Sequence, residues 1–118
     1  MKLTKKQIAL IEKDGFSVTR DEDCDSYIFQ KYSPEGQDFS FEISGETKEE
    51  FLKNIVDYYD GYDVSYETSL WLDDWGHGRN GAPYDMRDLY EDMEECRKYI
   101  WDLYVILAGG QSAIKELI

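Results

Sequence analysis

Hydrophobic and polar residues alternate along this chain with two periods, one of two residues and one of about 3.6 residues. The period of two is clearest in residues 39–43, and it recurs in residues 16–20 and 27–32. A polar connector at 21–25 and a turn containing proline and glycine at 33–36 separate these stretches. Sequential strands with short links favour an antiparallel meander. The first half of the chain therefore predicts a three-stranded antiparallel sheet with one apolar face that needs cover.

Helical spacing marks three further segments. Residues 4–14 begin with a threonine that is followed three residues later by a glutamine, which is the capping-box pattern, and they end before a glycine. Residues 47–61 begin with the same pattern, with glutamate as its second member, and carry apolar residues at helical intervals. Residues 64–75 are less regular, and we expect part of this segment to be helical.

The clearest element is a long amphipathic helix at residues 86–107. Its apolar residues follow spacings of three and four and form one seam: Met86, Leu89, Met93, Cys96, Ile100, Leu103 and Leu107. Its opposite face is predicted to carry polar residues: Asp88, Glu91, Asp92, Glu95, Lys98 and Asp102. The pattern predicts a helix that packs on the sheet. A homodimer formed by a coiled coil through helix 86–107 is the alternative to a monomer.

These elements define the predicted fold class, which is α+β. An N-terminal helix precedes the three-stranded antiparallel sheet, and two to three helices, including the long helix 86–107, then pack on the sheet. The chain has 118 residues, no internal repeat and no long linker. Residues 1–118 are therefore predicted to form a single domain.

The net charge of the chain limits the classes of partner that it can bind. The formal net charge is −13, and residues 57–95 carry twelve acidic and two basic residues, a net charge of −10. Residues 1–20 instead carry five basic and two acidic residues, a net charge of +3. A strongly acidic surface repels phosphates and anionic lipids, so we expect no direct binding to nucleic acid or to membranes. It attracts a basic protein surface, although a solvated acidic face without a partner is the simpler alternative.

Catalytic and metal-binding patterns are weak. His77 is the single histidine, and it lies in a glycine-rich loop at 76–83 without a nucleophile-elbow pattern. The loop spells G-x-G-x-x-G, but a predicted helix precedes it and acidic residues surround it, which favours a tight link over a phosphate site. Asp73, Asp74 and Asp85 lie near His77 with no calcium-loop spacing, and zinc ligands are too few. We predict no catalytic residue, metal or cofactor. A small enzyme of unknown chemistry is an alternative.

The two cysteines and the N-terminus indicate the compartment. Cys24 and Cys96 are too few for a disulfide framework, and we predict one buried and one exposed thiol in a reduced intracellular protein. Residues 1–10 lack the sustained apolar run of a signal peptide. No apolar segment approaches the length that spans a bilayer.

A partner-binding surface is predicted from the acid-rich middle of the chain. Residues 70–85 add tryptophan, tyrosine and arginine, which are the residue types that dominate interface energies. The predicted contact residues are Asp60, Asp63, Glu67, Asp73, Asp74, Trp75, His77, Arg79, Asn80, Tyr84, Asp88, Glu91, Asp92 and Glu95.

Five sequence stretches resemble a group of small acidic proteins that are encoded by phages and conjugative elements of Gram-positive gut bacteria. They are DFSFE at 38–42, YYDGYDV at 58–64, LWL at 70–72, GHGRNGAP at 76–83 and DLYEDM at 88–93. Residues 1–37 do not share the resemblance. It implies a mobile genetic element, the cytoplasm of a bacterial host and an anti-defence role, such as that of anti-CRISPR or anti-restriction inhibitors.

Charge, size and this resemblance together lead to a functional hypothesis. We expect an acidic protein that mimics nucleic acid and inhibits a host defence nuclease, such as a CRISPR nuclease, by occupying its basic nucleic-acid-binding surface. The alternative is an immunity or antitoxin protein that neutralises a nuclease toxin, because the sequence of such a protein would share these features.

Overall fold

The computed structural model describes residues 1–75 and 86–109. For residues 71–75 and 86 it describes the backbone but not the side chains. The predicted helices and strands all form, with ends shifted by about a residue. Residues 64–75 are helical throughout. In chain order the elements are α1 (Lys5–Lys13), β1 (Ser17–Asp21), β2 (Ser26–Tyr32), β3 (Asp38–Ser44), α2 (Lys48–Gly61), α3 (Val64–Trp75) and α4 (Met86–Leu107).

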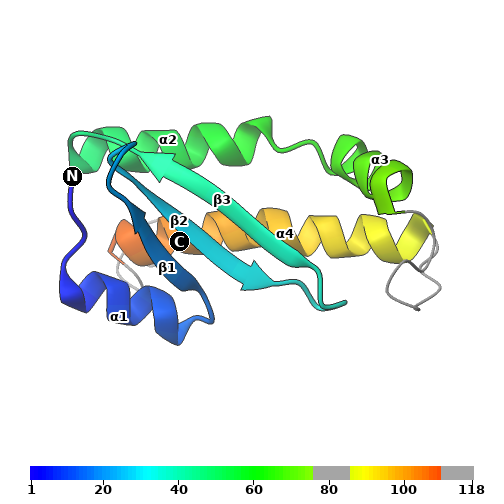
Figure 1. Cartoon of the computed structure of the whole chain (residues 1–118), viewed down its shortest axis with the longest axis horizontal. Helices are drawn as coiled ribbons and strands as arrows, with labels where there is room; N and C mark the ends of the chain where they lie inside the picture. The colour runs from blue at the N-terminus through cyan, green and yellow to red at the C-terminus, as the bar shows by residue number, and fades with distance from the viewer. Residues whose placement is uncertain (76–85, 110–118) are drawn as a thin grey trace.

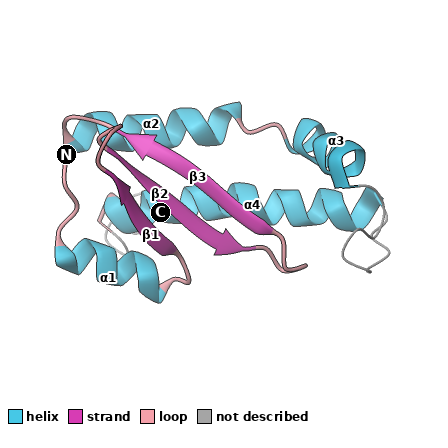
Figure 2. Ribbon diagram, in the orientation of Figure 1, coloured by secondary structure: helices cyan, strands magenta, loops and turns pink. Residues whose placement is uncertain are grey.

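The strands form the predicted antiparallel sheet in the order β1-β2-β3. Helix α4 crosses behind the sheet, with α2 on the β3 side and α1 on the β1 side (Figure 1). Helix α3 continues beyond α2 and packs on the first half of α4. Figure 2 shows the three strands in front of this layer of helices. The α+β class is therefore confirmed.

The register places alternate side chains of each strand on the face that the helices cover. Val18 lies opposite Phe29, which lies opposite Phe41, and Tyr27 lies opposite Ile43 in the next row. Phe29 is completely buried, and its ring is 5.6 Å from that of Phe41. Side chains on the other face, apart from the buried Ser26, are exposed or half-buried and mostly polar: Ser17, Thr19, Ile28, Gln30, Ser40 and Glu42.

Local capping explains where the first two helices begin. At α1 the box is complete, because the Thr4 amide donates to the Gln7 side chain at 2.8 Å and the Gln7 amide donates to the Thr4 hydroxyl at 3.1 Å. At α2 the Glu50 amide donates to the Thr47 hydroxyl, but the Glu50 carboxylate accepts from the amide of Glu46 instead of Thr47. The threonine is therefore the N-cap that the sequence predicted, with only half of the box.

The predicted seam of α4 is buried inside the chain. Six of its residues are at most 3% exposed: Leu89, Met93, Cys96, Ile100, Leu103 and Leu107. All of them except Leu89 join the strand and α2 side chains in one core cluster, which is the packing that the amphipathic pattern predicted. A coiled coil through this seam would need the same side chains, so the outer face of α4 is the face left for a second copy. Among the described residues, no helix combines the length and the apolar character that crossing a bilayer requires.

The seam should dominate stability. Replacing Ile100, which is completely buried, by alanine should lower the free energy of unfolding by about 2–5 kcal/mol, because the lost contacts leave a cavity. Leu10→Ala is the matched control. That side chain is 47% exposed, so its truncation should change stability by about 0.5 kcal/mol or less. Urea unfolding followed by circular dichroism measures both, and equal effects of the two substitutions would contradict the assigned core.

Candidate partner-binding surface

An acidic hollow lies between α4 and the turn that joins β2 to β3. Its volume is about 290 Å³. Helical spacing places its acids along one side of α4, since residues three and four apart are neighbours on a helix surface. Its lining residues are Pro34, Glu35, Asp88, Glu91, Asp92, Glu94 and Glu95. Four predicted contact residues, Asp88, Glu91, Asp92 and Glu95, are therefore brought together here.

Asp92 has a different position from the one predicted. Its side chain is only 2% exposed, so the expectation that it lies on the outer face of α4 is wrong. Asp92 accepts hydrogen bonds from the hydroxyl of Ser33 and, at 3.1 Å, from the amide of Glu35. It lies three residues after Leu89 and four before Cys96, on the flank of the buried seam. The hydrogen bonds that make this burial tolerable come from a turn almost sixty residues earlier in the chain.

Three of the other α4 acids, Glu91, Glu94 and Glu95, differ in how far they are neutralised. Glu91 and Glu94 are exposed, and no ion pair or hydrogen bond to them is found within the described residues. Glu95 is partly neutralised, because the ammonium group of Lys98 lies 2.9 Å from its carboxylate. Neighbouring carboxylates repel one another in the free protein. A cationic partner would reduce this electrostatic repulsion.

A second group of acids surrounds the junction of α2 and α3. Asp60 and Asp63 are exposed there, and Asp63 also caps α3 by accepting from the amide of Tyr66 at 3.1 Å. Glu67 lines a hollow of about 380 Å³ together with Asp57, Tyr58, Gly61 and Tyr62. Burial raises the pKa of Glu67, and the nearby charge of Asp63 raises it further.

Tyr62 contacts both the hollow at the α2–α3 junction and helix α4. Its ring lines the hollow at the α2–α3 junction, while its hydroxyl lies 3.5 Å from the sulfur of Met93, the residue after Asp92. Burial raises the pKa of this hydroxyl well above its usual range, and the charge of Glu67 adds to the effect. Tyr62 is therefore a neutral, buried contact that holds α2 against α4.

The structure does not describe the side chains of the remaining predicted contact residues. Asp73, Asp74 and Trp75 belong to the last turn of α3, but their side chains lie outside the description. His77, Arg79, Asn80 and Tyr84 lie outside the described residues altogether, and so do the glycine-rich loop and Asp85. Their predicted role in binding stays a prediction.

Both thiols favour the protonated form. Cys96 is completely buried and Cys24 is exposed, as predicted. Burial raises the pKa of Cys96 to about 12, and the charge of Asp92 contributes to that rise. The charge of Asp21 raises the pKa of Cys24. A thiol nucleophile needs a lowered pKa, so neither cysteine is activated.

One group of donor atoms was not anticipated from the sequence. Ligand-type atoms of Asp21, Cys24 and Glu42 lie within 4.8 Å of one another at the β1–β2 turn. The carboxylate of Asp21 already accepts from the amides of Asp23 and Cys24, and Glu42 accepts from the hydroxyl of Ser26. These internal bonds account for the cluster without a metal.

Sequence reasoning also missed two acids of the surface. Glu94 lies beside Glu91 on the outside of α4, and a full helical wheel would have included it. Glu35 comes from the β2–β3 turn. Its proximity to the other acids depends on tertiary packing, so the local pattern held no signal for it.

Comparisons with protein-family models, with curated proteins and with solved structures gave no match. The function is therefore inferred from the geometry and charge of the chain's own residues.

The buried carboxylate of Asp92 should be important for stability. Asp92→Ala removes an acceptor from the Ser33 hydroxyl and from the Glu35 amide, and should lower the free energy of unfolding by about 1–3 kcal/mol. Glu91→Ala, one position away and exposed, is the control and should change it by about 0.5 kcal/mol or less. Urea unfolding of both variants tests this. A loss for Asp92→Ala no larger than that of its neighbour would show that the turn is not held in this way.

Glu67 should make stability depend on pH. Its raised pKa means that the folded protein holds this proton more tightly than the unfolded chain does, so its contribution to stability falls as the pH rises through the folded pKa. Glu67→Gln should therefore be more stable than the wild type at neutral pH, and the difference should disappear at about pH 3, below the unfolded pKa, where both states are protonated. Thermal unfolding at both pH values measures this. Glu91→Gln, exposed, controls for the loss of one charge, and an identical pH profile for the two variants would contradict the effect.

Proposed function

We propose that this protein is an acidic binding protein that occupies a basic nucleic-acid-binding surface of a host defence nuclease, as an anti-CRISPR protein does. The observation that carries the proposal is the hollow beside α4, where carboxylates from two separate parts of the chain converge. A groove that binds nucleic acid presents lysine and arginine to a row of phosphates. A row of carboxylates at helical spacing offers the same groove an alternative set of anions.

The exposed acids lie on a well-supported helix, which favours binding. The seam of α4 is held in the core, and the turn opposite it is held by Asp92. A surface that is already ordered loses little conformational entropy when a partner binds, so more of the electrostatic attraction appears as affinity. Because the helix and the turn are both ordered, we propose the hollow itself as the contact surface, and not the net charge alone.

Charge polarity along the molecule would orient the complex. Helix α3 and the first half of α4 lie at one end of the fold, and α1 lies at the other (Figure 1). Residues 57–95 carry a net charge of −10, residues 21–56 carry −7 and residues 1–20 carry +3. A basic groove would attract the α3–α4 end most strongly, which raises the rate of productive encounters.

Substitutions of equal charge at the two ends test the proposal. Glu91, Glu94 and Glu95 changed together to glutamine should weaken binding to a sensitive nuclease by about tenfold or more, and should flatten the dependence of the affinity on salt. The matched control is Glu12→Gln, Glu46→Gln and Glu49→Gln, which removes the same charge from exposed positions outside the hollow. It should weaken binding by about twofold or less. Equal losses would mean that only net charge matters.

The choice of nuclease distinguishes the two classes of target. Calorimetry against a panel of guide-loaded CRISPR nucleases and of nuclease toxins should give saturable binding to a CRISPR nuclease, and the target nucleic acid should compete with it. Binding to a toxin alone would instead identify an immunity protein. Binding to a CRISPR nuclease that nucleic acid does not displace would refute occupation of its groove.

A further inference from the structure

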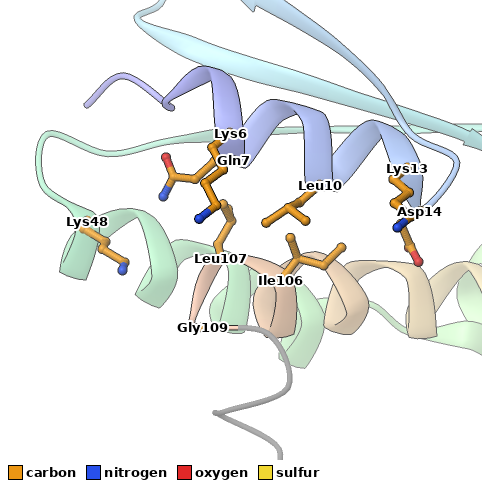
Figure 3. A pocket seen from close by; sticks show the side chains of 9 residues that line it. All are labelled: Lys6, Gln7, Leu10, Lys13, Asp14, Lys48, Ile106, Leu107 and Gly109. Atoms are coloured by element: carbon orange, nitrogen blue, oxygen red, sulfur yellow. The ribbon is translucent and has the colours of Figure 1, made fainter.

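A separate groove of about 710 Å³ lies between α1 and the last turns of α4 (Figure 3). Leu10 of α1 faces Ile106 and Leu107 of α4 across it, so its middle is apolar. The Leu10 side chain is 47% exposed, so part of its apolar surface is accessible to a ligand. The volume falls within the range of about 300–1,000 Å³ that is typical of small-molecule sites.

Polar groups are distributed unequally between the two ends of this groove. Lys6, Gln7 and Lys48 lie on one side of Leu10, and Lys13 lies on the other side beside Asp14 (Figure 3). The Gln7 side-chain oxygen already accepts from the Thr4 amide, so its NH₂ group is the part that can serve a ligand. One end therefore offers two ammonium groups and an amide donor, and the other end offers charges of both signs.

The two lysines at the first end have no counter-charge among the described residues. Within the described residues, no carboxylate lies at ion-pair distance from Lys6 or Lys48. The chain holds 26 acidic and 13 basic residues, so lysines without a partner are not explained by a shortage of acids. Two ammonium groups that no described carboxylate pairs, beside an apolar groove, match a ligand with an anionic head and an apolar body.

We propose that this groove binds a medium-chain acyl carboxylate, a small molecule of the fatty-acid class. The carboxylate lies between Lys6 and Lys48, and the acyl chain runs over Leu10 toward Lys13. Along α1 the distance from residue 6 to residue 13 is about 10 Å, at about 1.5 Å per residue. An acidic helix of another protein is the competing occupant, but such a helix is about 10 Å wide, whereas this groove offers a single line of apolar side chains with one cationic end.

The site is independent of the acidic hollow and of the function proposed for it. Its lining residues come from α1, the start of α2 and the end of α4, and none of them lines the hollow. The glutamine variant of Glu91, Glu94 and Glu95 should therefore bind the acyl carboxylate as the wild type does. Failure of either proposal thus leaves the other intact.

Sodium decanoate, kept below its micelle concentration, is the probe. Titration into the full chain, followed by ¹H–¹⁵N NMR, should give saturable shifts confined to α1, the start of α2 and the end of α4. Lys6→Gln and Lys48→Gln should each weaken the affinity about two- to fivefold, as expected for exposed charge pairs. Lys53→Gln removes the same charge from an exposed site on α2 outside the groove, and should leave the affinity unchanged.

Several outcomes would overturn this assignment. Decyltrimethylammonium binding as tightly as decanoate would show that the lysines do not select the ligand, and so would unchanged affinity in both lysine variants. Saturation by an acidic amphipathic peptide but not by decanoate would identify a protein segment as the occupant. If Ile114→Asp with Leu117→Asp raises the decanoate affinity several-fold, residues 110–118 of this chain compete for the groove and are its natural occupant.

Discussion

Burial of the aromatic face of the sheet against the seam of α4 is the interaction on which the other features of this structure depend. Phe29 and Phe41 on the strands and Ile100 on α4 belong to one core cluster, and at most 4% of each is exposed. The contact joins segments that are remote in sequence, so it depends on the tertiary fold and not on local pattern. Once the seam is buried, the exposed acids of α4, such as Glu91 and Glu94, are directed away from the core.

The same packing allows the chain to carry a large excess of negative charge. Repulsion between carboxylates opposes folding. Apolar burial offsets it, because each Å² of apolar surface removed from water stabilises the fold by roughly 25 cal/mol. Charged groups therefore lie outside the core, with Asp92 as the described exception. Its burial is tolerated because a hydroxyl and a backbone amide donate to it, and the same two bonds tie the β2–β3 turn to α4.

Charge and apolar surface are separated along the long helix. Near its start, α4 and the β2–β3 turn form a polar, acidic hollow suited to a cationic macromolecule. Near its end, α4 and α1 form a groove with an apolar middle and lysines at one side. Desolvation explains why the two surfaces select different ligands: an exposed acidic surface attracts cations without excluding much water, whereas an apolar groove gains most from a ligand that removes water from it.

Local periodicity and capping in the sequence determined the helices and strands, the antiparallel meander and the seam of α4, because these depend on neighbours a few residues apart. The excess of acid in residues 57–95 was equally evident. Only tertiary structure decided that Asp92 is buried, that Glu35 joins Glu91 and Glu94, and that Lys48 lies near Lys6 across a groove. Each of these results depends on which elements come to lie side by side, and that is set by burial of the whole core, which no local pattern contains.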